Sequence, residues 1–181
     1  MRWPEPVDKL WRDLEAVRGD VVKEAEPLSP SQAEWRPGET EWSVGEILHH
    51  LTLAEIATGK LTTKLTREAE ASGAARPFPD DLRELPPLSA APAATAGAPP
   101  VVWPERGKPI GELLADMKAV RERSRQSMDR LAALDPRVLV FKHFALGDHD
   151  LSQWWRLQVQ HDEIHLRQIR QVKSSPGFPG A

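Results

Sequence analysis

Apolar residues recur at helical spacing in four separate segments of the chain. In the first segment, Leu10, Leu14 and Val17 belong to an apolar stripe that is interrupted by charged residues, the pattern of an amphipathic helix. The same spacing returns in three later segments. Together they predict an all-α protein with helices over about residues 7–26, 43–72, 111–134 and 152–172.

The start of the second helix carries a specific signal. Ser43-Val-Gly-Glu46 has the form of a capping box, in which the serine side chain accepts from the Glu46 amide and the glutamate reaches back to the Ser43 amide. At the other end, Ser72-Gly73 is a suitable stop. We therefore expect this helix to begin directly after Ser43 and to end near Gly73.

Residues 73–109 differ from the rest because they are rich in proline and alanine. Such a segment cannot fold by itself, so it is interpreted as a flexible insertion or as a lid, with Phe78, Leu85 and Trp103 as candidate contacts. Residues 137–144, RVLVFKHF, are interpreted as an extended connection between helices. The predicted architecture is a single domain over 1–181, a four-helix bundle with a long crossover connection between its second and third helices.

Composition excludes several functions. The formal net charge is −3, which argues against a dedicated nucleic-acid binder, and the absence of cysteine excludes disulfides, thiolate nucleophiles and cysteine-ligated zinc. No apolar run is long enough for a membrane span, and the N-terminus lacks the apolar core of a signal peptide, so a cytoplasmic location is expected.

Histidines are the candidate functional residues. His161 and His165 stand four residues apart, which places both imidazoles on one helix face, where they can share a divalent cation. This spacing alone also arises by chance or in satisfied core histidines. The second helix supplies His49 and His50, and because adjacent residues diverge on a helix, only one of them can face the core.

Two stretches resemble the DinB-like (YfiT-like) superfamily of bacterial metal-binding four-helix bundles. LSPSQAEWRPGETEWSVGEILHHLTLAE (28–55) is similar to the approach to that family's second helix and contains its His-Leu pair, here at His50. HFALGDHDLSQWWRLQVQHDEIHLRQI (143–169) resembles the family's last helix with its HxxxHxxQI signature. The resemblance implies a three-histidine site made of His50, His161 and His165, and relatives that pair as homodimers.

Other polar residues are expected to have supporting or structural roles. Gln168 could orient a ligand or contact substrate, and Glu46 could support the site although the capping box explains it. His143 is expected to stabilise a turn, with metal ligation or a supporting role at the site as the alternatives. His49 is expected at a helix interface or in solvent. Exposure to solvent is expected for His149, Asp162, Glu163 and the RERSRQ run at 121–126.

Three neutral histidines would leave a divalent cation, zinc or nickel, with an open position. The resemblance implies metal-dependent hydrolases or transferases that use low-molecular-weight thiols. The sequence therefore predicts an enzyme that acts on a small molecule by thiol transfer or hydrolysis. The alternatives are a non-catalytic metal- or ligand-binding stress-response protein and a purely structural bundle.

Overall fold

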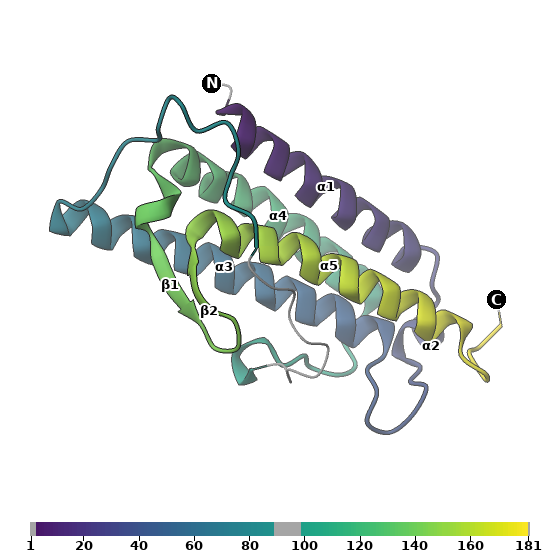
Figure 1. Ribbon diagram of the computed structural model, residues 1–181. Helices are drawn as coiled ribbons and strands as arrows, with labels where there is room; N and C mark the ends of the chain where they lie inside the picture. The colour runs from purple at the N-terminus through teal and green to yellow at the C-terminus, as the bar shows by residue number, and fades with distance from the viewer. Residues whose placement is uncertain (1–2, 89–98, 181) are drawn as a thin grey trace.

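The computed structural model describes residues 3–88 and 99–180, so the middle of the predicted insertion, 89–98, lies outside the described residues. Four long helices run side by side and confirm the predicted four-helix bundle (Figure 1). Their observed ends lie within two residues of the predicted ones. They are α1 (Glu5–Ala25), α3 (Val44–Ser72), α4 (Ile110–Ala133) and α5 (Leu151–Ser174).

The four helices close around a common core. Helix α3 packs against α4 and α5, while α1 packs against α5 and α4, so each helix has two neighbours. Two apolar clusters fill the interior. The first cluster includes Val21, Ile47, Leu48, Leu51, Leu113, Met117, Ile169 and Val172. The second includes Val7, Leu10, Leu14, Leu65, Met128, Leu131, Leu151 and Trp155.

Local signals explain the ends of α3. The Ser43 side chain accepts from the Glu46 amide, and the Glu46 carboxylate accepts from the Ser43 amide, which confirms the capping box. At the other end, Gly73 has a φ of 71° and its amide donates to the carbonyls of the last turn. Glycine takes this left-handed conformation without strain, so the helix ends there.

The interpretation of residues 137–144 as an extended connection missed a paired strand. Strand β1 (Val140–His143) pairs antiparallel with β2 (Gly147–Asp150), and the two form a hairpin that leads into α5. Gly147, at a φ of 82°, allows the tight turn. The structure also adds three short elements: α2 (Pro30–Glu34), η1 (Pro100–Val102) and η2 (Pro136–Val138).

The described parts of the insertion are held against the bundle. Phe78 and Leu85 pack on the second cluster, as expected from the sequence. Val102, in η1, is buried against α3, and the Glu105 amide donates to His49 Nδ1 at 2.8 Å. Trp103 touches the ring of Trp42 but is 58% exposed. Within residues 3–88 and 99–180, none of the helices has the length and apolar character that crossing a membrane requires.

Candidate metal centre

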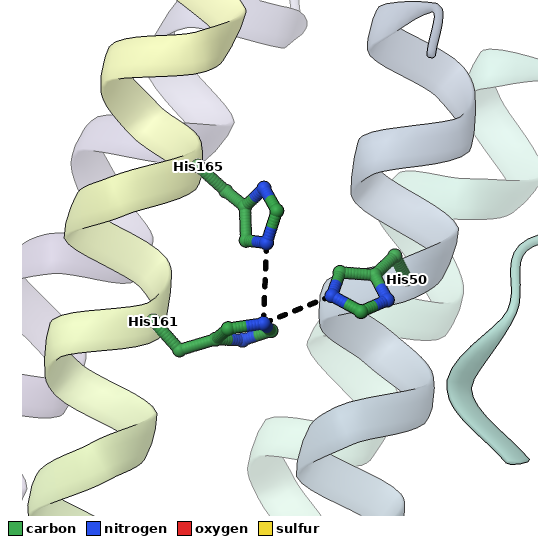
Figure 2. Close-up of side chains that lie close together, drawn as sticks. All are labelled: His50, His161 and His165. Atoms are coloured by element: carbon green, nitrogen blue, oxygen red, sulfur yellow. Dashed lines mark hydrogen bonds between the residues drawn. The ribbon is translucent and has the colours of Figure 1, made fainter. Parts of the chain in front are cut away.

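Three histidines from two helices meet between α3 and α5. His50 points from α3, and His161 and His165 point from α5 toward the same spot (Figure 2). His161 Nε2 lies 2.9 Å from His50 Nε2 and 3.1 Å from His165 Nε2. Helical spacing explains the α5 pair, but the approach of His50 from 111 residues away depends on the packing of α3 against α5.

The outer nitrogens of two of these rings have fixed partners. His50 Nδ1 lies 2.7 Å from the Val102 carbonyl oxygen, and His165 Nδ1 lies 2.7 Å from Gln168 Oε1. Both partners only accept hydrogen bonds, so each Nδ1 carries the proton and donates it. The Nε2 atoms of His50 and His165 therefore present lone pairs to the centre.

The two ring nitrogens of His161 cannot both be satisfied by hydrogen bonds within this cluster. Its Nε2 faces two lone pairs and could donate a proton to only one of them. Its Nδ1 is buried and has no hydrogen-bond partner among the described residues. A buried polar atom without a partner is uncommon in native proteins. A cation at the centre would accept all three Nε2 lone pairs and remove the conflict.

Burial keeps the three imidazoles neutral. Loss of solvent lowers the pKa of His50 to about 4, although its hydrogen bond to Val102 acts in the opposite direction. The pKa of His161 lies well below its ordinary value because of burial, and next because of the nearby His165 and His50. Burial also lowers the pKa of His165, against the effect of Gln168. Neutral imidazole is the form that binds metals.

Trp42 forms one wall of the centre and is itself in contact with Trp103. The Trp42 ring lies 4.8 Å from the His50 ring and stacks on His165 at a centroid distance of 6.2 Å. Trp103 packs edge-on against Trp42 at 5.5 Å. Trp42 covers one side of the centre, and the side chains of His161 and His165 are only partly buried.

The other candidate residues fall in three different places. Gln168 contacts the centre through His165. Glu46 is held by Arg36 and by the Ser43 amide; burial alone would raise its pKa, but these hydrogen bonds keep the pKa below its ordinary value. His143 lies in the hairpin, where its Nδ1 accepts from the Ala145 amide at 3.2 Å, the turn-stabilising role that the sequence suggested.

Several residues expected in solvent are buried. Asp162 is fully buried and pairs with Arg18. In the 121–126 run, Arg121 and Ser124 point into the core, whereas the other four residues are exposed, as expected. His149 is also buried, and it donates from Nδ1 to the Gly147 carbonyl at 3.1 Å. Glu163 is exposed, as expected.

His49, expected at a helix interface or in solvent, is buried and accepts from the amide of Glu105, which lies in the connection between η1 and α4. Sequence reasoning missed two neighbours of the centre. Val102 takes part through its backbone carbonyl, which leaves no sequence signal. Trp42 precedes the capping box of α3, so its distance from His50 along the helix could have placed it near the centre.

The fold and the histidine cluster define a four-helix-bundle protein with a candidate metal centre between two facing helices. A family model described as the DinB superfamily matches residues 13–169. The chain therefore belongs to the DinB superfamily.

One solved structure, described as that of TT2238, a four-helix bundle protein, is similar with a TM-score of 0.60 and 17% identity, over 91% of this chain and 98% of that chain. At this identity the likeness supports the fold alone. The search of curated proteins gave no match.

Proposed function

We propose that His50, His161 and His165 hold one divalent cation. The observation that carries the proposal is the convergence of three Nε2 atoms, two of which present lone pairs fixed by Val102 and Gln168. Zinc–nitrogen bonds of about 2.0–2.1 Å in a tetrahedral site require ligand nitrogens about 3.3 Å apart. Two of the observed separations, 2.9 and 3.1 Å, are slightly shorter than this, and all three ligand atoms lie within 4.8 Å of one another. Zinc and nickel both suit imidazole ligands.

The proposed activity is thiol transfer or hydrolysis on a small molecule. When bound, the cation would supply Lewis-acid activation of a thiol or a water molecule. In the described part of the chain, the histidine group contains no carboxylate, and Glu46 and Asp162 are paired with arginines. Thiol transfer is favoured over hydrolysis, because a thiol, with a pKa of about 8.5, needs less help from a protein base than water does.

Residues of the chain would bind and orient the reactants. Gln168 and the Val102 carbonyl hold two of the rings in place, and the Trp42 ring keeps water from one side of the centre. Trp103, exposed beside Trp42, offers an apolar surface to a substrate. A low-molecular-weight thiol as co-substrate, a homodimeric assembly and a cytoplasmic location belong to the same proposal.

A second candidate function is metal or ligand binding without catalysis. The observation that favours it is the same lack of a free carboxylate in the histidine group of the described residues. The two functions differ in one measurement, the rate of thiol conjugation to a panel of electrophiles by metal-loaded and metal-stripped protein. A metal-dependent rate supports the transferase, whereas no rate with any electrophile supports the binding protein.

Elemental analysis of the purified protein tests the metal site. We expect about one equivalent of divalent metal in the wild-type protein and a loss of that metal in His161→Ala. His143→Ala is the matched control, because it removes a histidine that lies outside the cluster and should retain the metal. Equal metal content in all three proteins would refute the site.

A further inference from the structure

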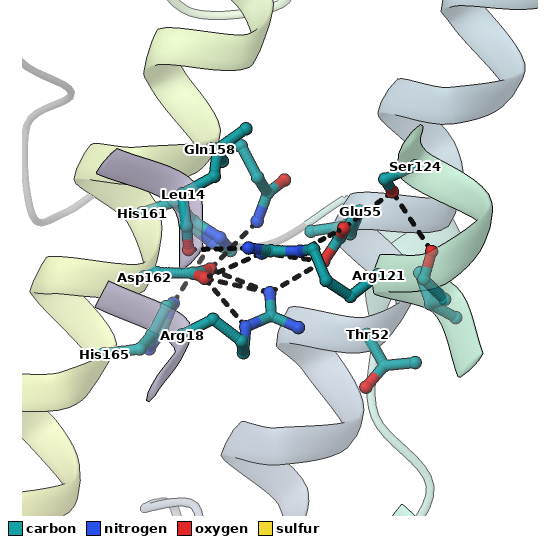
Figure 3. A network of polar contacts seen from close by, with 12 residues as sticks. Leu14, Arg18, Thr52, Glu55, Arg121, Ser124, Gln158, His161, Asp162 and His165 are labelled. Atoms are coloured by element: carbon teal, nitrogen blue, oxygen red, sulfur yellow. Dashed lines mark hydrogen bonds and ion pairs between the residues drawn. The ribbon is translucent and has the colours of Figure 1, made fainter. Parts of the chain in front are cut away.

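Each of the four long helices contributes one buried charge to a layer that crosses the bundle (Figure 3). We call it the charge layer. Its members are Arg18 of α1, Glu55 of α3, Arg121 of α4 and Asp162 of α5, none of them more than 6% exposed. The layer contains two cations and two anions, so it is formally neutral.

Ion pairs and hydrogen bonds in the layer connect all four helices. Arg18 donates to Asp162 through Nε at 2.9 Å, and its Nη2 lies 3.0 Å from Glu55 Oε2. Arg121 donates to Glu55 Oε1 at 2.8 Å and to the Leu14 carbonyl at 2.6 Å. These contacts fix α5 to α1, α1 to α3, α3 to α4 and α4 to α1.

The charge layer lies beside the three histidines. Asp162 follows His161 directly, and Gln158, one turn earlier, donates to Asp162 at 3.0 Å. Glu55 stands five residues after His50 on α3, about 7.5 Å of helix rise. Arg18 is close enough to contribute to the lowered pKa of His161. Both helices that carry the histidines are therefore held at this level by ionic contacts.

Stability alone is a weak explanation for these charges. Burial of four charges carries a large desolvation cost, and buried ion networks are often replaced by apolar residues without loss of stability. Arg18 Nη1, in addition, has no hydrogen-bond partner among the described residues. Directional contacts differ from apolar packing in that they define one register between helices.

We propose that the charge layer positions the histidine cluster for metal binding by fixing the register of α5 against α3. The inference rests on the proposed function. Its members are positioning residues, because they act on the centre through His50 and His161 and do not touch a substrate. Removal of the Arg18–Asp162 pair should leave a folded protein in which the three Nε2 atoms no longer converge as closely.

The test compares the double variant Arg18→Met/Asp162→Asn with Leu131→Ala. The double variant removes one charge of each sign and nearly preserves volume, so the layer stays neutral. Leu131→Ala is the matched control, since it weakens packing in the second cluster without touching the layer. The readouts are zinc affinity by competition with a chromophoric chelator, helix content by circular dichroism, and urea unfolding of the metal-free proteins.

We expect the double variant to bind zinc about 10- to 100-fold more weakly than wild type, as for other residues that orient metal ligands. The control should stay within about twofold, because a mostly folded protein loses little apparent affinity. A folded double variant with wild-type zinc affinity would overturn the proposal. If the double variant does not fold, Asp162→Glu replaces it: charge is kept, the side chain gains one methylene, and unchanged affinity gives the same refutation.

Wild-type protein that binds neither zinc nor nickel refutes the proposed function separately. The positioning role of the charge layer is then tested on metal-free protein by the ¹⁵N NMR chemical shifts of the imidazoles, which report the contacts of each ring nitrogen. The double variant should change the His161 shifts, and Leu131→Ala should not. Unchanged His161 shifts in the double variant would overturn the positioning role.

Discussion

Acid should destabilise the metal-free protein through His50 in a pH range above that of the carboxylates. The folded state holds the pKa of His50 at about 4, while the unfolded chain has the ordinary value of 6.5. Below pH 6.5 the unfolded state takes up a proton at His50 that the folded state does not. The free energy of unfolding therefore decreases as the pH is lowered, until the pH reaches the folded-state pKa. Above about pH 6.5 both states are neutral and His50 has no such effect.

The magnitude follows from the shift. A lowering of the pKa from 6.5 to about 4 reduces the free energy of unfolding by roughly 3 kcal/mol once the pH is below both pKa values. By about pH 5 the part of the loss that is due to His50 should reach about 2 kcal/mol. Glu55 also has a lowered pKa, because Arg18 and Arg121 outweigh the raising effect of burial, but its contribution is lost only below its ordinary value of 4.5. The two effects are therefore separable by pH.

Urea unfolding of wild type and His50→Asn, both with a chelator present, measures the effect. Asparagine keeps a donor near the position of Nδ1, so the contact with the Val102 carbonyl can persist, and it does not titrate. The variant should be less stable at pH 7 but should lose about 2 kcal/mol less than wild type between about pH 7 and pH 5. Identical losses in the two proteins would refute the assignment of the acid sensitivity to His50.

Three further changes have defined outcomes. Gln168→Ala removes the acceptor of His165 Nδ1 and should weaken zinc binding about 10- to 100-fold in chelator competition; wild-type affinity would exclude an orienting role. Ser43→Ala removes the cap of α3 and should cost about 1 kcal/mol in urea unfolding, so an unchanged midpoint would contradict the capping box. Gly73→Ala forces a side chain into the left-handed region at a φ of 71° and should lower stability by about 1 kcal/mol; a gain in stability would show that the end of α3 relaxes.

The long helices could be predicted from the sequence because their signals are local. Helical periodicity and the capping box at Ser43 depend on residues a few positions apart, and the observed bounds of α3 agree with them. Helix α2 carries the same kind of signal, a Ser29–Gln32 capping box with proline at the first helical position, and could have been found. The hairpin gave a weaker signal, since its pairing joins two strands of only four residues around one glycine.

Only the part of the candidate site that depends on local spacing could be predicted from the residues themselves. The His161–His165 pair follows from helix geometry, whereas the approach of His50 came from a family resemblance and not from spacing. The Val102 carbonyl could not be inferred, because a backbone atom leaves no mark on the sequence. The contacts of His50 with the α5 histidines and with Val102 depend on which segments pack against α3, and this is a property of the whole bundle.

The charge layer shows which sequence signal was overlooked. Arg18 stands four residues after Leu14 and three before Val21, so it occupies the apolar stripe of α1 and cannot point to solvent. Arg121, four residues after Met117, stands in the same way on the stripe of α4. A charge on an apolar stripe must meet an opposite charge from another helix, since an unpaired buried charge is too costly. Charges of both signs on the buried stripes of neighbouring helices therefore predict mutual pairs between those helices.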